Sequence, residues 1–292
     1  MKKHPHPQPL PCGGGEPDEF TAVPPWLPSP AGAGPGAGLR PYALTIAGFD
    51  PSAGAGVLAD VKTLEASGVY GLAACTALTV QNDVAFERVN WVGLPEIQDQ
   101  IRLLLARFDI GVVKIGLIKS LPLLRELIGW LKARKPAVQI VWDPVLKATA
   151  GYEFHARPEA GLLQAICREL ALITPNRPEA LRLLPAATAE EAAETLAAWC
   201  PVLLKGGHAT GHFATDVLLL PEVRHALATP RLPHGAKHGS GCVLSAAVLA
   251  RLALGDDLPA ACWAGKAYTA AFLGSNDTLL GYHFGNEQHE NQ

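Results

Sequence analysis

Three of the strands expected from the sequence end in residues that could bind a phosphate group or a divalent cation. Asp143 ends the first of these strands, and Asn176 and Glu179 follow the second. Lys205 ends the third. Because the carboxyl ends of parallel strands meet at one edge of a sheet, the four side chains should lie together. Carboxylate and amide oxygens can hold the hydration shell of Mg²⁺, and a lysine can neutralise phosphate, so this edge is predicted to bind both.

Each of these residues also has a structural explanation. Asn176 could cap a helix, Glu179 could complement the dipole in the first helical turn, and Lys205 could be a solvated strand end. Their convergence on one edge, rather than any single residue, favours a ligand site.

The segment from His238 to Cys242 leads directly into an Ala-rich helix. The backbone N–H groups of Gly239, Ser240 and Gly241 would be unpaired there, and with the helix dipole they could bind an anion such as phosphate. The same field favours a thiolate, so we expect Cys242 to be more acidic than a free cysteine and able to accept a proton. The structural alternative makes Ser240 the N-cap and Cys242 a small buried side chain.

A second glycine-rich loop, residues 48–56, follows the first expected strand and precedes a helix that carries Asp60. Glycine has no side chain, so the backbone of such a loop can approach a ligand closely. Gly54, Gly56 and Ala59 also match a dinucleotide-binding pattern, but that pattern places its first glycine at the strand end, whereas several residues intervene here. The loop is expected to cradle a small molecule, with a plain turn and a dinucleotide site as alternatives.

The elements that must position these residues alternate between strand and helix. This pattern is typical of a parallel sheet with crossover helices. The expected strands are 42–47, 72–79, 111–115, 138–143, 171–174, 202–205 and 214–220. The expected helices are 94–108, 121–133, 158–170, 188–199, 240–254 and 258–273. We predict an α/β fold, a three-layer αβα sandwich with a mostly parallel sheet whose ligands bind at the carboxyl ends of the strands.

Composition divides the chain into regions. Residues 1–40 contain 7 of the 29 Gly and 10 of the 25 Pro, with too few periodic apolar positions to form a core. We expect a disordered tail there, a folded domain over 41–285 and a short polar tail over 286–292. The folded part is about the size of one large α/β domain.

Several classes of protein are excluded by composition. A net charge of −3 with 49% hydrophobic residues does not favour nucleic-acid binding. The apolar runs are shorter than a bilayer requires, and no apolar region of a secretory signal follows Lys2 and Lys3. The six cysteines form no CxxC pair, which favours reduced thiols in a cytoplasmic protein. We expect neither a membrane nor a nucleic-acid partner.

Seven segments, taken in order, resemble the hydroxymethylpyrimidine/phosphomethylpyrimidine kinases of thiamine biosynthesis, a family with the ribokinase-like fold. These segments are 43–56, 76–82, 114–117, 143–145, 174–179, 204–208 and 238–242. The resemblance covers about residues 42–274. It implies that ATP phosphorylates the hydroxymethyl group of 4-amino-5-hydroxymethyl-2-methylpyrimidine, and then phosphorylates the monophosphate to the diphosphate. It also implies Mg²⁺, and members of the family are often homodimers.

The resemblance also implies a role for each matching residue. Cys242 would take the proton of the substrate hydroxyl, while the amides of Gly239, Ser240 and Gly241 would stabilise the transferring phosphoryl group. Gln81 would bind the aminopyrimidine through its side-chain amide. The other pocket positions that match are Gly48, Asp60, Leu117 and Val145. The positions that match for ATP are Lys205 and Asn176, and those for Mg²⁺ are Glu179 and Asp143.

The chain departs from the family pattern at several positions. Ser240 stands where the family has Thr, Ala53 where it has Gly, and Leu58 where it has Gln. Thr149 replaces a lysine, which removes positive charge that the anionic acceptor of the second phosphorylation would need. The alternatives are a pyridoxal kinase of the same fold, a weakly catalytic pyrimidine-binding protein and a dinucleotide-dependent oxidoreductase.

Overall fold

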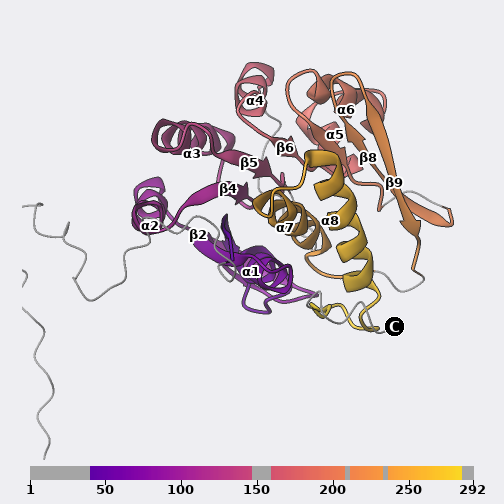
Figure 1. Ribbon diagram of the computed structural model, residues 1–292, viewed down its shortest axis with the longest axis horizontal. Coiled ribbons are helices and arrows are strands. Elements are labelled where there is room, and N and C mark those ends of the chain that lie inside the picture. Colours follow the sequence, from indigo (N-terminus) through magenta and orange to yellow (C-terminus); the bar gives the residue numbers. More distant parts are fainter. Residues whose placement is uncertain (1–39, 147–158, 208–210, 233–235, 285–292) are drawn as a thin grey trace, which may run out of the picture. The chain divides into compact units, whose positions relative to one another are not determined.

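The computed structural model describes residues 40–146, 159–207, 211–232 and 236–284 (Figure 1). Its strands are β1 (Tyr42–Phe49), β2 (Tyr70–Gln81), β3 (Phe86–Trp91), β4 (Ile110–Ile115), β5 (Gln139–Trp142), β6 (Leu172–Ile173), β7 (Val202–Leu204), β8 (Phe213–Leu219) and β9 (Arg224–Pro230). Its helices are α1 (Gly56–Ala66), α2 (Leu94–Arg107), α3 (Leu121–Arg134), α4 (Ala160–Cys167), α5 (Arg177–Leu183), α6 (Ala189–Ala197), α7 (Ser240–Ala253) and α8 (Leu258–Leu273). Every strand and helix expected from the sequence is present, with ends that differ by a few residues.

The strands form one sheet in the order β3-β2-β1-β4-β5-β6-β7-β8-β9. Six neighbouring strands in this order, β2-β1-β4-β5-β6-β7, pair in parallel. β3 pairs antiparallel with β2 at one edge, and β8 and β9 add an antiparallel ribbon at the other. The predicted α/β fold with a mostly parallel sheet is confirmed, and the carboxyl ends of its parallel strands lie at one edge.

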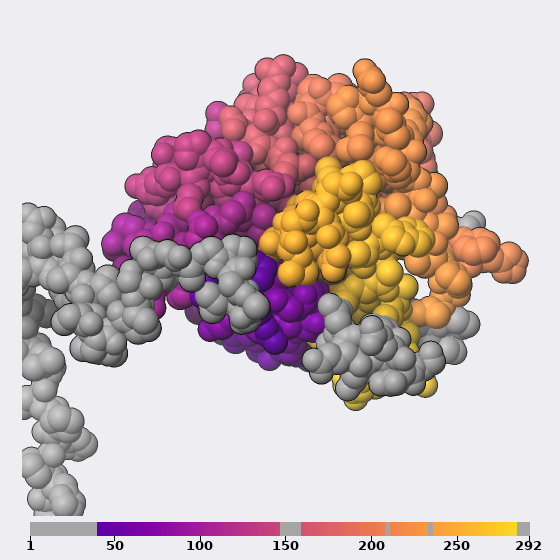
Figure 2. All heavy atoms as spheres, in the orientation of Figure 1, coloured from indigo at the N-terminus to yellow at the C-terminus, as the bar shows by residue number. Residues whose placement is uncertain are grey.

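Helices cover both faces of the sheet, and each face has its own buried core. One core packs α2, α3, α4, α5 and α6 against one face, with Trp142 among its largest buried side chains. The other packs α1, α7 and α8 against the opposite face through residues such as Val112 and Val248. Figure 1 shows α7 and α8 on the face opposite α3, and in the space-filling view α8 lies against β8 and β9 (Figure 2). This arrangement brings the start of α7 to the centre of the sheet.

Two strands, β3 and β9, were not expected from the sequence. Both lie at edges of the sheet, and most of their residues are exposed or half-buried. In β9 only Leu227 is buried. Edge strands with one polar face and few buried residues lack the apolar run or clean alternation on which strand prediction depends.

Some predictions fall outside the described residues. These are the disordered tail predicted over 1–40, of which only Arg40 is described, the polar tail over 286–292 and the effect of Thr149 in place of a lysine. The limits of the domain, 41 and 285, also stay predictions. Within the residues that the structure describes, none of the helices combines the length and the apolar character that crossing a bilayer requires.

Candidate functional site

The segment that precedes α7 allows no side chain at its first glycine. Gly239 is the N-cap of α7 and adopts the left-handed conformation, with φ of 73°. A Cβ at this position would lie 1.9 Å from the carbonyl oxygen of Gly54. Ser240 is the first helical residue, so the alternative that made it the N-cap is wrong, and no side chain caps the first turn. No side chain therefore binds the first-turn amides, as an anion site requires. The Ser240 N–H, predicted to be unpaired, instead donates a 3.4 Å hydrogen bond to the carbonyl oxygen of Lys237.

A fully buried ion pair lies beneath this turn. The Nζ atom of Lys114, in β4, donates a 2.5 Å hydrogen bond to Oδ1 of Asp60 in α1, and both side chains are 0% exposed. Thr45 donates to Oδ2 of the same carboxylate, also at 2.5 Å. Lys114 Nζ lies 3.5 Å from the carbonyl oxygen of Cys242. Burial opposes the charge of Lys114, but Asp60, with smaller contributions from Cys242 and Asp143, outweighs it and raises the pKa of the lysine, which is therefore protonated.

A second buried pair lies at the ends of β5 and β7. Lys205 Nζ is 2.9 Å from Oδ1 of Asp143 and 3.5 Å from the carboxylate of Glu179. Thr174 and Ser245 donate to the two oxygens of Asp143, and Ser245 belongs to α7. Burial opposes the charge of Asp143, but the ammonium groups of Lys205 and Lys114 and the hydrogen bonds from Lys205 and Thr174 together outweigh it and lower the pKa of the carboxyl. The predicted convergence of these strand-end residues is found in the structure.

Lys205 lies directly below the phosphate-binding turn predicted from the sequence. A Cβ added to Gly241 would be 3.2 Å from Lys205 Nζ and 3.9 Å from Oδ2 of Asp143. A glycine at this position thus leaves the ammonium close to the first turn of α7. A phosphate bound at that turn could be reached by the amides and the lysine together.

Asn176 and Glu179 bind each other at the start of α5. Oδ1 of Asn176 accepts from the Glu179 N–H at 2.8 Å, and the Glu179 carboxylate accepts from the Asn176 N–H at 2.7 Å. This reciprocal capping box is the structural explanation considered for both residues. The pair still lies at the predicted edge, because Glu179 also approaches Lys205. Burial raises the pKa of Glu179, although Lys205 acts in the opposite direction. The roles of Asn176 in ATP binding and Glu179 in Mg²⁺ binding stay predictions.

The glycine loop between β1 and α1 is organised around Asp50. Its carboxylate is 1% exposed and accepts from Ser52 N–H, Ser52 Oγ and Ala55 N–H. Nε2 of His238 lies 2.8 Å from Oδ2 of Asp50. Burial opposes the charge of Asp50, but the bonds from His238 and Ser52 outweigh it and lower the pKa of the carboxyl. Two loops separated by nearly 190 residues are thereby joined.

Cys242 is less acidic than the sequence predicted. The side chain is half-buried, and burial raises the pKa of its thiol to about 11, although the ammonium of Lys114 acts in the opposite direction. The carboxylates of Asp60 and Asp143 raise the pKa further, while a hydrogen bond from the Gly56 N–H lowers it. The expectation that Cys242 is more acidic than a free cysteine is therefore wrong, because burial and the two carboxylates outweigh the helix field.

The predicted pocket residues occupy different positions around this site. Gly48 lies next to Leu117, since a Cβ on the glycine would be 2.8 Å from Cδ2 of that leucine. Val145, three residues beyond the end of β5, is half-buried. Asp60 is buried, and each of its carboxylate oxygens already accepts a hydrogen bond. Their roles as pocket residues stay predictions.

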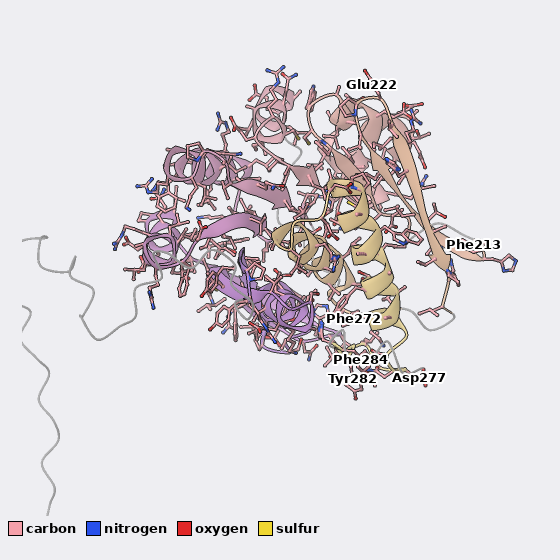
Figure 3. The ribbon with its side chains drawn as sticks, viewed as in Figure 1. Phe213, Glu222, Phe272, Asp277, Tyr282 and Phe284 are labelled. Atoms are coloured by element: carbon pink, nitrogen blue, oxygen red, sulfur yellow. The ribbon has the colours of Figure 1, made fainter. Side chains whose placement is uncertain are left out.

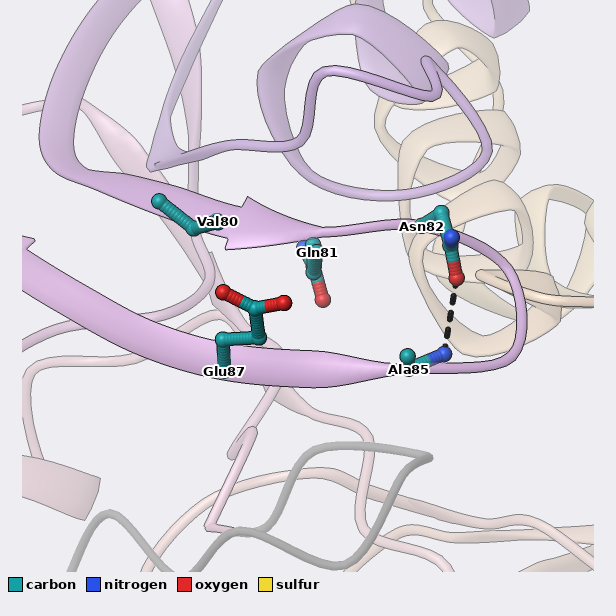
Figure 4. Close-up of a pocket in the computed structure, with 5 residues that line it drawn as sticks. All are labelled: Val80, Gln81, Asn82, Ala85 and Glu87. Atoms are coloured by element: carbon teal, nitrogen blue, oxygen red, sulfur yellow. Dashed lines mark hydrogen bonds between the residues drawn. The ribbon is translucent and has the colours of Figure 1, made fainter.

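Gln81 lies apart from the buried pairs, at the end of β2. Its side chain lines a small pocket in the β2–β3 hairpin with Val80, Asn82, Ala85 and Glu87 (Figure 4). Among the described residues, no hydrogen bond joins the Gln81 amide to the rest of the site. The amide is thus free to pair with a ligand at the mouth of the hairpin, and its role in pyrimidine binding stays a prediction.

Sequence reasoning assigned no role to Lys114, Asp50 or His238. Lys114 carried a signal, because a lysine in an otherwise apolar parallel strand must find a buried partner. Asp50 and His238 carried no comparable signal, since their pairing depends on how two distant loops meet. The structure adds all three to the site.

The sequence model of the phosphomethylpyrimidine kinases matches residues 50–286. The chain belongs to the phosphomethylpyrimidine kinase family. It is 35% identical over 251 residues to the hydroxymethylpyrimidine/phosphomethylpyrimidine kinase of Rhizobium meliloti. This match covers 82% of this chain and 93% of that protein. It is 32% identical to the thiamine biosynthesis multifunctional protein ThiED of Corynebacterium efficiens over 83% of this chain but only 34% of that longer protein. The chain thus corresponds to about a third of the multifunctional protein. Membership of a kinase family does not support the dinucleotide-site alternative for the glycine loop.

The fold is also similar to that of a solved pyridoxal kinase. The ADP complex of Bacillus subtilis pyridoxal kinase matches with a TM-score of 0.69 and 29% identity, over 82% of this chain and 93% of that chain. The chain therefore has the ribokinase-like fold that the resemblance implied.

Replacing Gly239 with Ala should destabilise the protein more than replacing Gly68. Gly68 has a similar φ of 81° but no atom within 4 Å of an added Cβ, whereas the Cβ at Gly239 would meet the backbone of Gly54. We expect the free energy of unfolding to fall by about 1 kcal/mol for Gly68→Ala and about 2 to 4 kcal/mol for Gly239→Ala. If urea unfolding gave the same fall in the free energy of unfolding for both variants, the contact of Gly239 with Gly54 would not contribute to stability.

Breaking the buried Lys114–Asp60 pair should be far more costly than breaking an exposed pair. Lys114→Met leaves a buried carboxylate without its cation and should lower the free energy of unfolding by about 3 to 5 kcal/mol. Adding Asp60→Asn should recover part of this loss, because the unpaired charge is removed. The matched control is Lys135→Met, which breaks an exposed pair in which Lys135 Nζ lies 2.8 Å from Asp109 Oδ1. The free energy of unfolding should fall by less than about 1 kcal/mol in this control. A Lys114→Met variant as stable as the control would contradict a charged pair.

Proposed function

We propose that this chain transfers the γ-phosphoryl group of ATP to the hydroxymethyl group of 4-amino-5-hydroxymethyl-2-methylpyrimidine and then to the resulting monophosphate, in thiamine biosynthesis. The observation that carries the proposal is the uncapped first turn of α7, which lies over Lys205 and beside Cys242, in a chain of this kinase family. The name of the Rhizobium meliloti relative supports both acceptors.

The phosphoryl group would transfer at the start of α7. Phosphoryl transfer needs mostly positioning and stabilisation of charge on the equatorial oxygens. Backbone N–H groups of Gly239, Ser240 and Gly241 can donate to those oxygens, and the positive end of the helix adds to their field. Lys205, held in place by Asp143, can neutralise the phosphates of ATP. The ADP complex of the Bacillus subtilis kinase supports a nucleotide as co-substrate.

Mg²⁺ fits the donor set at the same edge. Asp143, just after β5, and Glu179, in the first turn of α5, supply carboxylate oxygens that both approach Lys205. This hard cation prefers oxygen ligands with several retained waters. When bound, Mg²⁺ would neutralise charge on the phosphates and orient them. Asp143 is kept ionised by Lys205, so a negative ligand is available at neutral pH.

Acceptor binding would occur between the glycine loop, Leu117 and the β2–β3 hairpin. The amide of Gln81 offers one donor and one acceptor, which match the amino group and ring nitrogen of an aminopyrimidine. Gly48 leaves room beside Leu117 because any side chain there would meet the leucine. Asp60 is already bound by Lys114 and Thr45, so it would support this pocket by fixing α1.

Cys242 would accept the proton of the acceptor hydroxyl as the thiolate. Since burial raises the pKa of Cys242 to about 11, the thiolate is a minor species near neutral pH. Proton transfer at this residue is therefore limited by the small thiolate fraction. The neighbouring ammonium of Lys114 increases that fraction.

A cytoplasmic location is consistent with the free thiols of Cys75, Cys167, Cys200, Cys242 and Cys262. A homodimer and the absence of a nucleic-acid partner stay predictions.

Pyridoxal kinase activity is the second candidate function, and the similarity to the Bacillus subtilis enzyme favours it. Pyridoxal also presents a hydroxymethyl group on a heteroaromatic ring.

ADP release by the purified chain tests the proposal directly. With Mg-ATP, we expect turnover with hydroxymethylpyrimidine and with its monophosphate, and a kcat/KM at least tenfold lower with pyridoxal, because Gln81 matches an aminopyrimidine edge. Turnover with pyridoxal alone would replace the proposal by the second candidate. No turnover with any of the three acceptors would leave a binding protein.

The pH dependence of kcat should report the Cys242 thiol. If the thiolate accepts the proton and its pKa is about 11, kcat should rise with pH by about tenfold per unit between pH 7 and 9. Cys242→Ala should lower kcat by roughly 10²-fold and abolish the slope. The control is Cys75→Ala, which removes another half-buried thiol, in β2. This variant should keep the wild-type kcat and its rise with pH. A normal kcat in Cys242→Ala would assign the residue to packing.

A further inference from the structure

The last described segment, residues 275–284, turns back from α8 and binds the residue that precedes the α7 motif. Nζ of Lys237 donates to the carbonyl oxygens of Asn276 and Thr278, both at 2.6 Å, and to Oδ1 of Asn276 at 3.1 Å. The lysine is only 6% exposed. Figure 3 shows Asp277 and Tyr282 of this segment beyond the end of α8.

Lys237 is unusual among the buried lysines because its acceptors are neutral oxygens. Lys114, Lys205 and Lys266 each pair with an aspartate. Among the described residues, no carboxylate lies within ion-pair distance of Lys237. An ammonium buried on neutral acceptors contributes little net stability, because its desolvation cost offsets its hydrogen bonds.

The next residue, His238, is held from two sides. Its N–H donates to the carbonyl oxygen of Leu279 at 2.9 Å, and Nε2 of its ring lies 2.8 Å from Asp50 in the glycine loop. A Cβ added to Gly54 would lie 2.6 Å from the ring of His238 and 2.7 Å from Leu280. The glycine loop, the start of α7 and the C-terminal segment therefore meet at this histidine.

The C-terminal segment is itself anchored to the body of the domain. Nδ1 of His283 lies 3.0 Å from the hydroxyl of Tyr268 in α8 and 3.5 Å from Oγ1 of Thr63 in α1. Its ring packs against Phe272, with centroids 4.9 Å apart. Because both ends of the segment are fixed, it can transmit the position of α1 and α8 to the residues before α7.

We propose that Lys237 and His238 are positioning residues, which the segment 276–280 holds so that the Gly239–Cys242 turn faces the glycine loop in the geometry needed for phosphoryl transfer. The proposal rests on the proposed function for its kinetic consequence. The structural part of the proposal, that the C-terminal segment fixes the amides at the start of α7, holds for any acceptor. A displacement of about 1 Å at a reacting centre can reduce the rate by about 10²-fold.

Lys237→Met tests this, because it keeps the length of the side chain and removes the three hydrogen bonds. We expect kcat to fall at least tenfold while KM for ATP and for the pyrimidine changes less than threefold, since the variant misplaces the turn without removing a ligand contact. Lys237→Arg keeps the charge and donors and should restore at least a third of the wild-type kcat. Asn276→Ala removes the Oδ1 acceptor of Lys237 and the side-chain bonds of Asn276 to Thr278 and Leu280, and keeps the two backbone carbonyl acceptors. It should lower kcat in the same direction.

The matched control is Lys132→Met in α3. Lys132 also donates through Nζ to a backbone carbonyl, that of Val138 at 2.8 Å, but α3 packs on the face of the sheet opposite α7. It should keep the wild-type kcat. The folded fraction of each variant is measured in parallel, so that kcat is calculated per folded molecule.

Hydrogen–deuterium exchange gives a readout that does not require activity. The amides of His238, which donates to Leu279, and of Val243, which donates to Gly239, should exchange at least tenfold faster in Lys237→Met and in Asn276→Ala than in the wild type. They should exchange at the wild-type rate in Lys132→Met. Should the kinase assay fail with every acceptor, this experiment still tests the contact. Wild-type exchange in both variants at the start of α7, or a wild-type kcat in folded Lys237→Met, would overturn the proposal.

Discussion

The start of α7 depends on two buried lysine–carboxylate pairs, Lys114–Asp60 and Lys205–Asp143. A helix begins with partial positive charge, so two ammonium groups beneath it would repel it if each were not neutralised. The two carboxylates cancel that charge and tie the helix to the sheet and to α1. The first-turn amides can then face an anion without competing for a carboxylate of their own. Hydrogen bonds of Lys114 with Cys242 and of Ser245 with Asp143 connect α7 to these pairs.

A second constraint is the close approach of backbone to backbone. Gly239 contacts Gly54, and Gly56 contacts Gly48, with no space for a Cβ at Gly239 or Gly56. The glycine loop and the start of α7 therefore form one unit, which the Asp50–His238 contact completes. Under the proposed function, acceptor recognition by the glycine loop and phosphoryl transfer at the start of α7 would be coupled through this contact.

The sequence alone identified the strand ends that meet at the site and the type of chemistry they support. Asp143, Asn176, Glu179 and Lys205 converge as predicted because strand order and direction follow from alternating apolar runs, which the sequence records locally. The acidity of Cys242 was predicted wrongly. Helix position is a local property, whereas burial and the nearby carboxylates of other elements are not.

Local pattern thus determined the α/β class, most element positions, the glycine loop and the motif from His238 to Cys242. Only the tertiary structure decided which charges meet, because a hydrogen bond between residues far apart in the chain leaves no periodic trace in either segment. The pairs Lys114–Asp60 and Asp50–His238 and the contact of Lys237 with the C-terminal segment are of this kind. The edge strands β3 and β9 belong with them, since their pairing partners rather than their own apolar residues make them strands.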